Sequence, residues 1–192
     1  TAIKTLSECI EGDFHRIQFT PDLLPADIIG TEVYRPETGE FTFQAGPVFH
    51  NLILADEVNR APAKVQSALL EAMGERQVTV GQVTHNLSDL FLVMATQNPI
   101  EQEGTYPLPE AQLDRFLLHV SIDPPDSETE KKILHLVRAQ HRGNPNPNAM
   151  PTKISQQHIF TARQQVNSLH MAEALDDYIV AIVMATRQPQ AF

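Results

Sequence analysis

The feature that constrains the fold of this chain most is a short apolar run over residues 52–55, followed directly by Asp56 and Glu57. Four consecutive apolar residues are typical of a strand that is covered on both faces, as the strands of parallel sheets are. In open parallel sheets, ligands bind outside the carboxyl ends of the strands. Two adjacent carboxylates there indicate a ligand site, and a metal-bound phosphate suits them best. The alternative is a core strand whose terminal charges simply reach solvent.

The rest of the chain predicts an α/β fold with a parallel sheet flanked by helices. Apolar or alternating runs predict further strands over residues 16–19, 90–95 and 117–120. Hairpins are expected over residues 32–49 and 77–85, because each has alternating residues around a glycine-bearing turn. Helical spacing predicts helices over residues 3–10, 20–24, 62–74 and 127–143, with Gly74 ending the third and Ser127 capping the fourth.

A polar loop, Asn144-Pro145-Asn146-Pro147-Asn148, is the best candidate for a linker. Beyond it, apolar residues recur with helical spacing and no strand is predicted. We therefore expect an α/β core over residues 1–147 and the start of an all-helical domain over residues 148–192.

Charge and cysteine content exclude several classes of protein. The formal net charge of −10 disfavours a general nucleic-acid or membrane-surface binder. Cys9 is the single cysteine, so an intrachain disulfide framework is excluded, and no apolar run is long enough to span a membrane. A cytoplasmic protein is expected. Because the sequence starts at Thr1 without methionine or signal peptide, we expect it to be part of a longer polypeptide.

Four residues match the needs of a phosphoryl-transfer site. Such a site requires a carboxylate for Mg²⁺, a group that orients water, and positive charge on the transferred phosphate. Asp56 is the candidate for Mg²⁺ and Glu57 for the water, while Asn98, just past the run over residues 90–95, is placed to contact the same water or the phosphate. Arg115 is the candidate cation. Asn98 as a turn residue and Arg115 in an ion pair with Asp114 or Glu110 are the open alternatives.

Five motifs together resemble the MoxR family of AAA+ ATPases. The ordered set is far more specific than any one motif, and it spans nearly the whole chain. The motifs are Gly46-Pro47-Val48-Phe49, Leu54-Ala55-Asp56-Glu57-Val58-Asn59-Arg60-Ala61-Pro62, Gln66-Ser67-Ala68-Leu69-Leu70-Glu71-Ala72-Met73, Ala95-Thr96-Gln97-Asn98-Pro99 and Leu113-Asp114-Arg115-Phe116.

The resemblance implies an ATPase that uses ATP and Mg²⁺, with Asp56 and Glu57 as its Walker B pair and Asn98 as its sensor-1 residue. It makes Arg115 the arginine finger, which acts on ATP bound by a neighbouring subunit, and hence implies a homo-oligomeric ring, usually a hexamer. Arg60 is a second candidate cation, although a local ion pair is the simpler interpretation. Members of the family remodel client proteins, often with von Willebrand factor A domain partners.

The sequence departs from the family in one respect. No G-x-x-x-x-G-K-[ST] occurs in it, so the loop and the lysine that hold the β- and γ-phosphates are missing. Residues 1–6 match the helix that follows this loop in the family, so the family's first strand is expected to be missing too, and this chain alone is expected to bind ATP poorly. A chelatase-type or nucleic-acid motor of the same clade, or a non-catalytic fragment, are the alternatives.

Overall fold

The computed structural model describes residues 2–98, 104–122, 124–141 and 153–187. The chain divides into two compact units, Thr1–Lys153 and Ile154–Phe192. The first unit contains α1 (Ala2–Cys9), β1 (Phe14–Gln18), α2 (Pro25–Ile29), β2 (Gly30–Arg35), β3 (Glu40–Ala45), η1 (Pro47–Phe49), β4 (Leu52–Asp56), η2 (Val58–Arg60), α3 (Ala63–Glu75), β5 (Gln77–Val80), β6 (Val83–Asn86), β7 (Leu92–Ala95), α4 (Glu110–Leu113) and α5 (Ser127–His141).

A parallel sheet of order β1-β4-β7 forms the centre of this unit. The run over residues 52–55 forms a buried strand, as predicted, and its Leu52, Ile53 and Ala55 are at most 1% exposed. This strand, β4, is the middle one. In register, Gln18 of β1 lies beside Asp56, and Ala95 of β7 lies beside Ala55. All three strands therefore end at one edge of the sheet, which is where the acidic pair lies.

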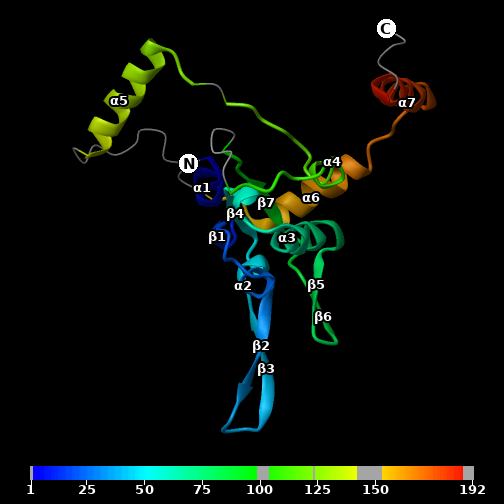
Figure 1. Cartoon of the computed structure of the whole chain (residues 1–192). Helices are drawn as coiled ribbons and strands as arrows, with labels where there is room; N and C mark the ends of the chain where they lie inside the picture. Colours follow the sequence, from blue (N-terminus) through cyan, green and yellow to red (C-terminus); the bar gives the residue numbers. More distant parts are fainter. Residues whose placement is uncertain (1, 99–103, 123, 142–152, 188–192) are drawn as a thin grey trace. The chain divides into compact units, whose positions relative to one another are not determined.

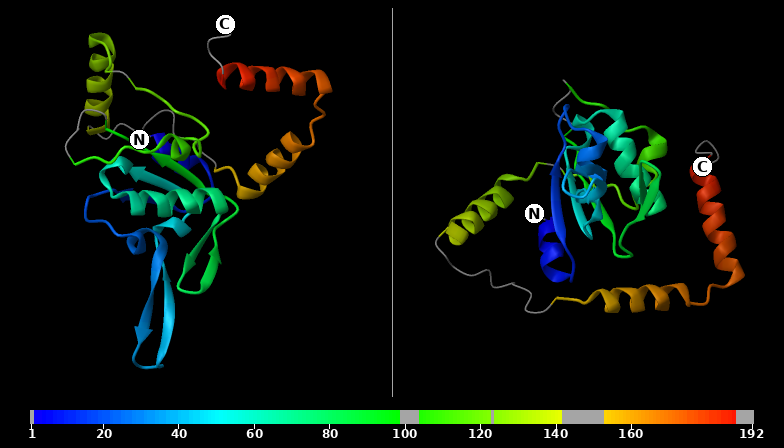
Figure 2. Two further views of the ribbon diagram at one scale, coloured as in Figure 1. Left: turned by 45° about the vertical axis from the view of Figure 1, so that its right-hand side comes forward. Right: turned by 90° about the horizontal axis from the view of Figure 1, so that it is seen from below.

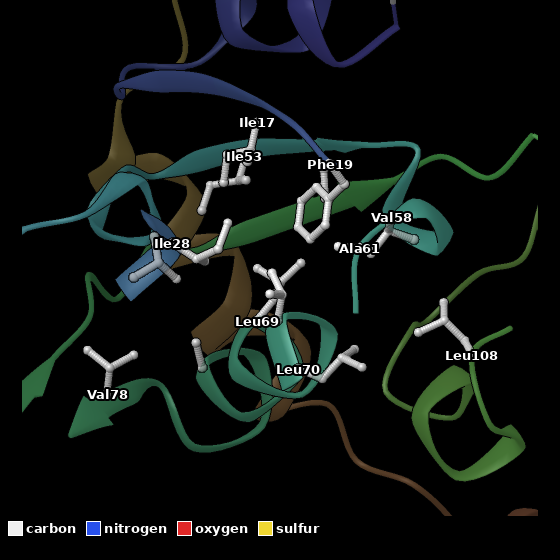
Figure 3. Packing of buried hydrophobic residues seen from close by; sticks show 14 of the residues in the cluster. Ile17, Phe19, Ile28, Ile53, Val58, Ala61, Leu69, Leu70, Val78 and Leu108 are labelled. Atoms are coloured by element: carbon white, nitrogen blue, oxygen red, sulfur yellow. The ribbon is translucent and has the colours of Figure 1, made fainter. Parts of the chain in front are cut away.

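Helices cover both faces of the sheet (Figure 3). Because successive strand residues point to opposite faces, Ile53 and Ala55 of β4 belong to the core cluster and Leu52 does not. The predicted helix after the acidic pair, α3, adds Val65 and Leu69 to this cluster, and Figure 3 shows Ile53 and Leu69 pointing into the same core. Burial of these side chains is what fixes α3 beneath the acidic end of β4.

Both predicted hairpins form, as the antiparallel pairs β2-β3 and β5-β6. They extend from the same side of the unit (Figures 1 and 2). At their bases an aromatic contact joins them, because the rings of Phe43 and His85 stack with centroids 3.9 Å apart. The turn of the second hairpin needs Gly81, whose φ of 61° is the left-handed region that glycine adopts without a steric penalty.

The predicted strand over residues 117–120 is wrong. This segment has no regular structure, and Leu117 is 95% and Leu118 76% exposed. A strand needs a neighbour for its backbone hydrogen bonds, and among the described residues none pairs with this segment. The run over residues 90–95 also differs from expectation, since only Leu92–Ala95 form a strand. Leu92 is 40% exposed because β7 has a ladder with β4 alone in the described chain.

Several helix positions differ from those predicted. The helix predicted over residues 20–24 is wrong, because these residues contain no helix and α2 begins only at Pro25. Pro25 presets the helical φ, and the Asp27 carboxylate accepts the Leu24 N–H at 2.8 Å. Gly74 does not end α3, which continues to Glu75 and ends with Arg76 in the left-handed region. The cap of α5 is Asp126, which accepts the Thr129 N–H at 2.8 Å, rather than Ser127.

The second unit contains the predicted helices α6 (Gln156–Asn167) and α7 (Glu173–Arg187). The expected linker, over residues 144–148, lies outside the described residues. Ser155 caps α6 by accepting the His158 N–H. None of the helices within the described ranges is both long and apolar enough to cross a membrane.

Candidate functional site

The carboxyl edge of the sheet gathers polar side chains from all three strands. Gln18 ends β1, Asp56 ends β4, and Thr96 directly follows β7. The parallel register brings these ends level with one another, because Gln18 pairs with Asp56 and Ala55 pairs with Ala95. The acidic pair is thus flanked on both sides by hydrogen-bonding groups.

Asp56 uses both carboxylate oxygens. Its Oδ1 accepts the Thr96 hydroxyl at 2.5 Å, and its Oδ2 accepts Nη2 and Nε of Arg16 at 2.5 and 3.0 Å. The hydrogen bond from Thr96 and then the bond and charge of Arg16 hold the pKa of Asp56 below its ordinary value, against a smaller opposing effect of burial. Asp56 is therefore ionised at neutral pH, as a carboxylate that holds a cation must be.

Glu57 has a left-handed backbone, with φ 56° and ψ 48°. Residues other than glycine seldom adopt this backbone conformation, because it costs about 1 kcal/mol. The Glu57 Oε2 atom accepts Nε2 of Gln18 at 3.0 Å and Nη1 of Arg60 at 3.1 Å. The Arg60 contact is the local ion pair that was the simpler interpretation of this residue, and its proposed contact with a nucleotide stays a prediction.

A buried amide supports the turn that follows the acidic pair. Gln66 of α3 is 1% exposed, and its Nε2 lies within hydrogen-bond distance of the carbonyl oxygens of Val58, Ala61 and Tyr106 at 3.3, 3.1 and 3.0 Å. The Tyr106 N–H in turn donates to the carbonyl of Asn59 at 2.6 Å. The backbone after Glu57 is therefore tied both to α3 and to the segment that follows residue 104.

The other two predicted site residues lie on separate elements. Asn98 is half-buried on the segment that leaves β7 at the same edge, and its contact with water or phosphate stays a prediction. Arg115 follows α4, and its Nη1 donates to the Leu70 carbonyl of α3 at 2.5 Å. Within the described residues this guanidinium binds a carbonyl and does not form the ion pair with Asp114 or Glu110 that was the alternative interpretation. The structure thus brings Asp56, Glu57 and Arg60 together, whereas Arg115 lies after α4 and contacts α3.

The donor set suits Mg²⁺ better than a metal that the protein holds alone. Mg²⁺ usually keeps several waters and takes one or two carboxylates plus substrate phosphates. Asp56 and Glu57 supply such carboxylates at the strand end, and Asp56 is ionised. In the part of the chain that the structure describes, no group of three or more His, Cys, Asp or Glu could hold a metal ion. The residues present therefore fit an ion that is bound jointly with phosphate.

Sequence reasoning missed Arg16, Gln18, Thr96 and Gln66. Arg16 and Gln18 alternate with buried Ile17 on β1, which is the pattern of a strand with one polar face. That pattern predicts a polar face but does not identify the strand beside it. Thr96 belongs to the motif that contains Asn98 and lies two positions before it. Its position directly after an apolar run is the signal that points to it, because the same edge of the sheet carries Asp56.

Comparison with known proteins gives consistent results. The sequence pattern of the "ATPase family associated with various cellular activities (AAA)" matches residues 1–118. The chain is 48% identical over 189 residues to "Chaperone MoxR1" of Mycobacterium tuberculosis, covering 98% of this chain and 48% of that protein. It is 47% identical over 186 residues to "Uncharacterized protein YeaC" of Bacillus subtilis, covering 97% of this chain and 57% of that protein.

A solved structure has the same fold. The crystal structure of a proposed ATPase from Cytophaga hutchinsonii superimposes with a TM-score of 0.82 at 50% identity, covering 99% of this chain and 56% of that one. The chain therefore belongs to the AAA family of ATPases. Within that family its relatives place it in the MoxR group, as the motifs indicated. The chain spans about half the length of the curated relatives it matches.

Proposed function

We propose that these residues belong to a MoxR-type AAA+ ATPase that hydrolyses MgATP in a ring of subunits and remodels client proteins. The observation that carries this proposal is that two adjacent carboxylates at the end of β4 are held by different side chains. Asp56 is held between β1 and β7, whereas the left-handed backbone turns Glu57 toward Gln18 and Arg60. Two carboxylates with separate partners are suited to two separate roles.

In this proposal Asp56 holds the Mg²⁺ of MgATP. Bound Mg²⁺ neutralises charge on the phosphates that react. The oxygen that faces Arg16 is the one that can exchange partners, because Arg16 is 59% exposed on its side chain and can move into solvent. The other oxygen keeps its bond from Thr96. Asp56 thus has one fixed and one exchangeable oxygen.

Glu57 is proposed to orient the water that attacks the γ-phosphate. Gln18 and Arg60 hold its Oε2 atom, which leaves the second oxygen of the carboxylate to accept a proton of that water. Asn98 is proposed to contact the same water or the phosphate from the end of β7. Arg60 is proposed to remain near the nucleotide as the partner of Glu57.

Arg115 is proposed to act on ATP bound by the neighbouring subunit. In its own chain it hydrogen-bonds the Leu70 carbonyl on α3 and is separate from the cluster around Asp56, which is compatible with a role in another subunit's site. A cation supplied from outside stabilises negative charge in the transition state of phosphoryl transfer. This role requires a closed ring, and a hexamer is our proposal.

The β- and γ-phosphates need a loop that the 192 residues do not contain, since no G-x-x-x-x-G-K-[ST] occurs among them. We propose that the active protein has such a loop and that these 192 residues alone bind ATP poorly. Calorimetric titration of the 192-residue polypeptide with MgATP is expected to show no saturable binding. Micromolar binding would contradict this part of the proposal.

Client proteins, a von Willebrand factor A domain partner and a cytoplasmic location are proposed from the MoxR resemblance and the single cysteine. A nucleic-acid motor of the same clade is the rival. It would place cations on the hairpins, yet residues 77–87 contain no Lys or Arg, and residues 30–45 contain one Arg against three Glu. This charge pattern favours protein clients over nucleic acid.

The test is Glu57→Gln in the protein that carries both these residues and a phosphate loop. Nucleotide binding is expected to persist while turnover falls by about 100-fold or more, because Asp56 remains and the base-like oxygen is lost. Glu75→Gln is the matched control, since Glu75 is exposed at the end of α3. Turnover near that of the wild type would remove Glu57 from this role.

A mixing experiment tests the shared site. Arg115→Ala alone is expected to lower turnover, and mixing it with the Glu57→Gln protein is expected to restore part of it, because some interfaces then contain an intact Glu57 and an intact Arg115. If no mixing ratio restores activity, Arg115 does not act across subunits.

A further inference from the structure

Thr96 bonds to four consecutive residues at the end of β4. Its backbone N–H donates to the Ala55 carbonyl at 2.9 Å, and its carbonyl accepts the Val58 N–H at 3.0 Å. Its hydroxyl lies between these two backbone contacts, 2.5 Å from Oδ1 of Asp56 and 2.9 Å from the Glu57 nitrogen. The residue that directly follows β7 therefore contacts every residue of the turn that carries the acidic pair.

The directions of the two hydroxyl bonds are fixed by chemistry. A hydroxyl has one proton to donate, and the Glu57 N–H can only donate, so the hydroxyl accepts from Glu57. Its own proton is then available for Asp56, whose ionised carboxylate can only accept. The hydroxyl thus connects the side chain of Asp56 to the backbone of Glu57 in a single chain of hydrogen bonds.

This chain of bonds acts at an unfavourable backbone conformation. Glu57 has a left-handed φ of 56°, which residues other than glycine seldom adopt. The hydroxyl accepts the amide proton of that same residue, and the Thr96 carbonyl accepts that of the next residue. Both bonds are made in this arrangement of the turn, so they stabilise the left-handed conformation of Glu57.

From this arrangement we propose that the Thr96 hydroxyl is the positioning group of the site, holding the Asp56 side chain and the Glu57 backbone in the arrangement that metal binding and water orientation each need. Thr96 acts through the two acids and does not itself contact the reacting atoms. The inference rests on the proposed function for its catalytic consequence, while the positioning itself concerns only contacts within this chain.

Two substitutions separate the hydroxyl from the shape of the side chain. Thr96→Val keeps the β-branched shape and removes the hydroxyl, and Thr96→Ser keeps the hydroxyl. Thr84→Val is the matched control, because Thr84 has its hydroxyl 3.2 Å from that of Thr79 in the separate β5-β6 sheet.

The first measurement is amide hydrogen exchange in the nucleotide-free protein, resolved at residues 57 and 58. Thr96→Val is expected to raise the exchange rate of the Glu57 amide about fivefold, the effect of losing one ordinary hydrogen bond. The Val58 amide is expected to change less because its acceptor is a backbone carbonyl. Thr96→Ser and Thr84→Val are expected to match the wild type.

The second measurement is MgATP turnover beside nucleotide affinity. Thr96→Val is expected to lower kcat by about 10- to 100-fold, because misplaced catalytic groups lose much of their effect, while nucleotide affinity changes far less. Thr96→Ser is expected to restore kcat. Unaltered Glu57 exchange in Thr96→Val, or a Ser variant as defective as the Val variant, would overturn the proposal. A wild-type protein without turnover would overturn the proposed function instead, and the exchange comparison would still decide the role of Thr96.

Discussion

The two edges of the three-stranded sheet are built from different kinds of polar group. At the carboxyl edge, Asp56 and Glu57 are ion-paired with Arg16 and Arg60. At the amino edge, the neutral side-chain amide of Asn51 joins the segments that lead into the strands. Asn51 accepts the Asp13 N–H at 3.0 Å and donates to Ser88 Oγ and the Leu90 carbonyl at 2.8 and 3.0 Å.

The two edges differ in whether their side-chain hydrogen bonds can be exchanged for bonds to a ligand. Asn51 joins the segments that lead into all three strands, and its oxygen and both of its amide protons are engaged within the chain. The carboxyl edge instead contains a half-exposed cation, Arg16, on a carboxylate that a metal ion can claim. The amino edge therefore stabilises the sheet, and the carboxyl edge has groups that can exchange partners, as the general rule for ligand sites in parallel sheets requires.

Asp56→Asn should have the largest effect on turnover of the changes that test this comparison. We expect MgATP turnover to fall by about 100-fold or more, since the amide cannot supply the charge that Mg²⁺ needs. The free energy of unfolding should change by no more than about 1 kcal/mol, because an ion pair whose Arg16 partner is 59% exposed contributes little. Turnover assays and urea unfolding measure the two effects. A large loss of stability without loss of turnover would reverse the assignment of this edge.

Asn51→Ala should have the opposite profile. It removes three hydrogen bonds, at about 1 kcal/mol each, and should lower the free energy of unfolding by about 2–3 kcal/mol. Turnover per folded molecule should stay at the wild-type value. Urea unfolding followed by circular dichroism measures the loss, and Asn86→Ala, at an exposed position of β6, is the control. A change in kcat at full folding would mean that the two edges are coupled.

Arg16→Gln tests how far Arg16 lowers the pKa of Asp56 at the carboxyl edge. Asp56 has a lowered pKa, so its ionised form contributes stability that is present above the unfolded pKa, about 3.9, and is lost as the pH falls through the folded value. Without Arg16 the pKa of Asp56 should rise toward the ordinary value but stay below it, because Thr96 remains. Stability at neutral pH should fall by about 1 kcal/mol at most.

Carboxyl ¹³C NMR titration measures this change directly. Asp126 is the internal control, because its pKa is lowered by the Thr129 hydrogen bond and does not depend on Arg16. An unchanged pKa of Asp56 in Arg16→Gln would show that Thr96 alone keeps this carboxylate ionised.

Local patterns predicted the charged edge better than the neutral one. The apolar run before Asp56 and the glycine turns of both hairpins are signals within a few residues of sequence, and each formed as predicted. Asn51 gave no such signal, and the position of Thr96 after an apolar run did not reveal its contacts. The roles of both residues depend on which strands become neighbours and in what register. Residues 117–120 show the same limit from the other direction, since an apolar run becomes a strand only where a neighbour accepts its hydrogen bonds.

The placement of cations was equally hard to predict. Arg60 pairs with Glu57, three positions before it, and a partner so close in sequence can be predicted from spacing. Arg115 binds a backbone carbonyl of α3, far from it in sequence, and Arg16 binds Asp56 across two strands. Such contacts follow from packing of the elements, which the spacing of residues along the chain does not contain.

His50→Gln should have the smallest effect, and it tests the amino edge. His15 and His50 stack with ring centroids 4.7 Å apart, and burial, followed by the charge of His50, lowers the pKa of His15. A lowered pKa means that the folded protein disfavours protonated His15, so stability should fall as the pH drops below about 6.5 and level off below the folded pKa. In His50→Gln the pKa of His15 should rise only part of the way, because burial is the larger cause and remains. ¹⁵N or ¹H NMR titration of His15 measures the shift, with exposed His170 as the control. If the pKa of His15 returned fully to its ordinary value, His50 would be the dominant cause of the shift. Charge rather than burial would then determine the pKa of His15 at the amino edge.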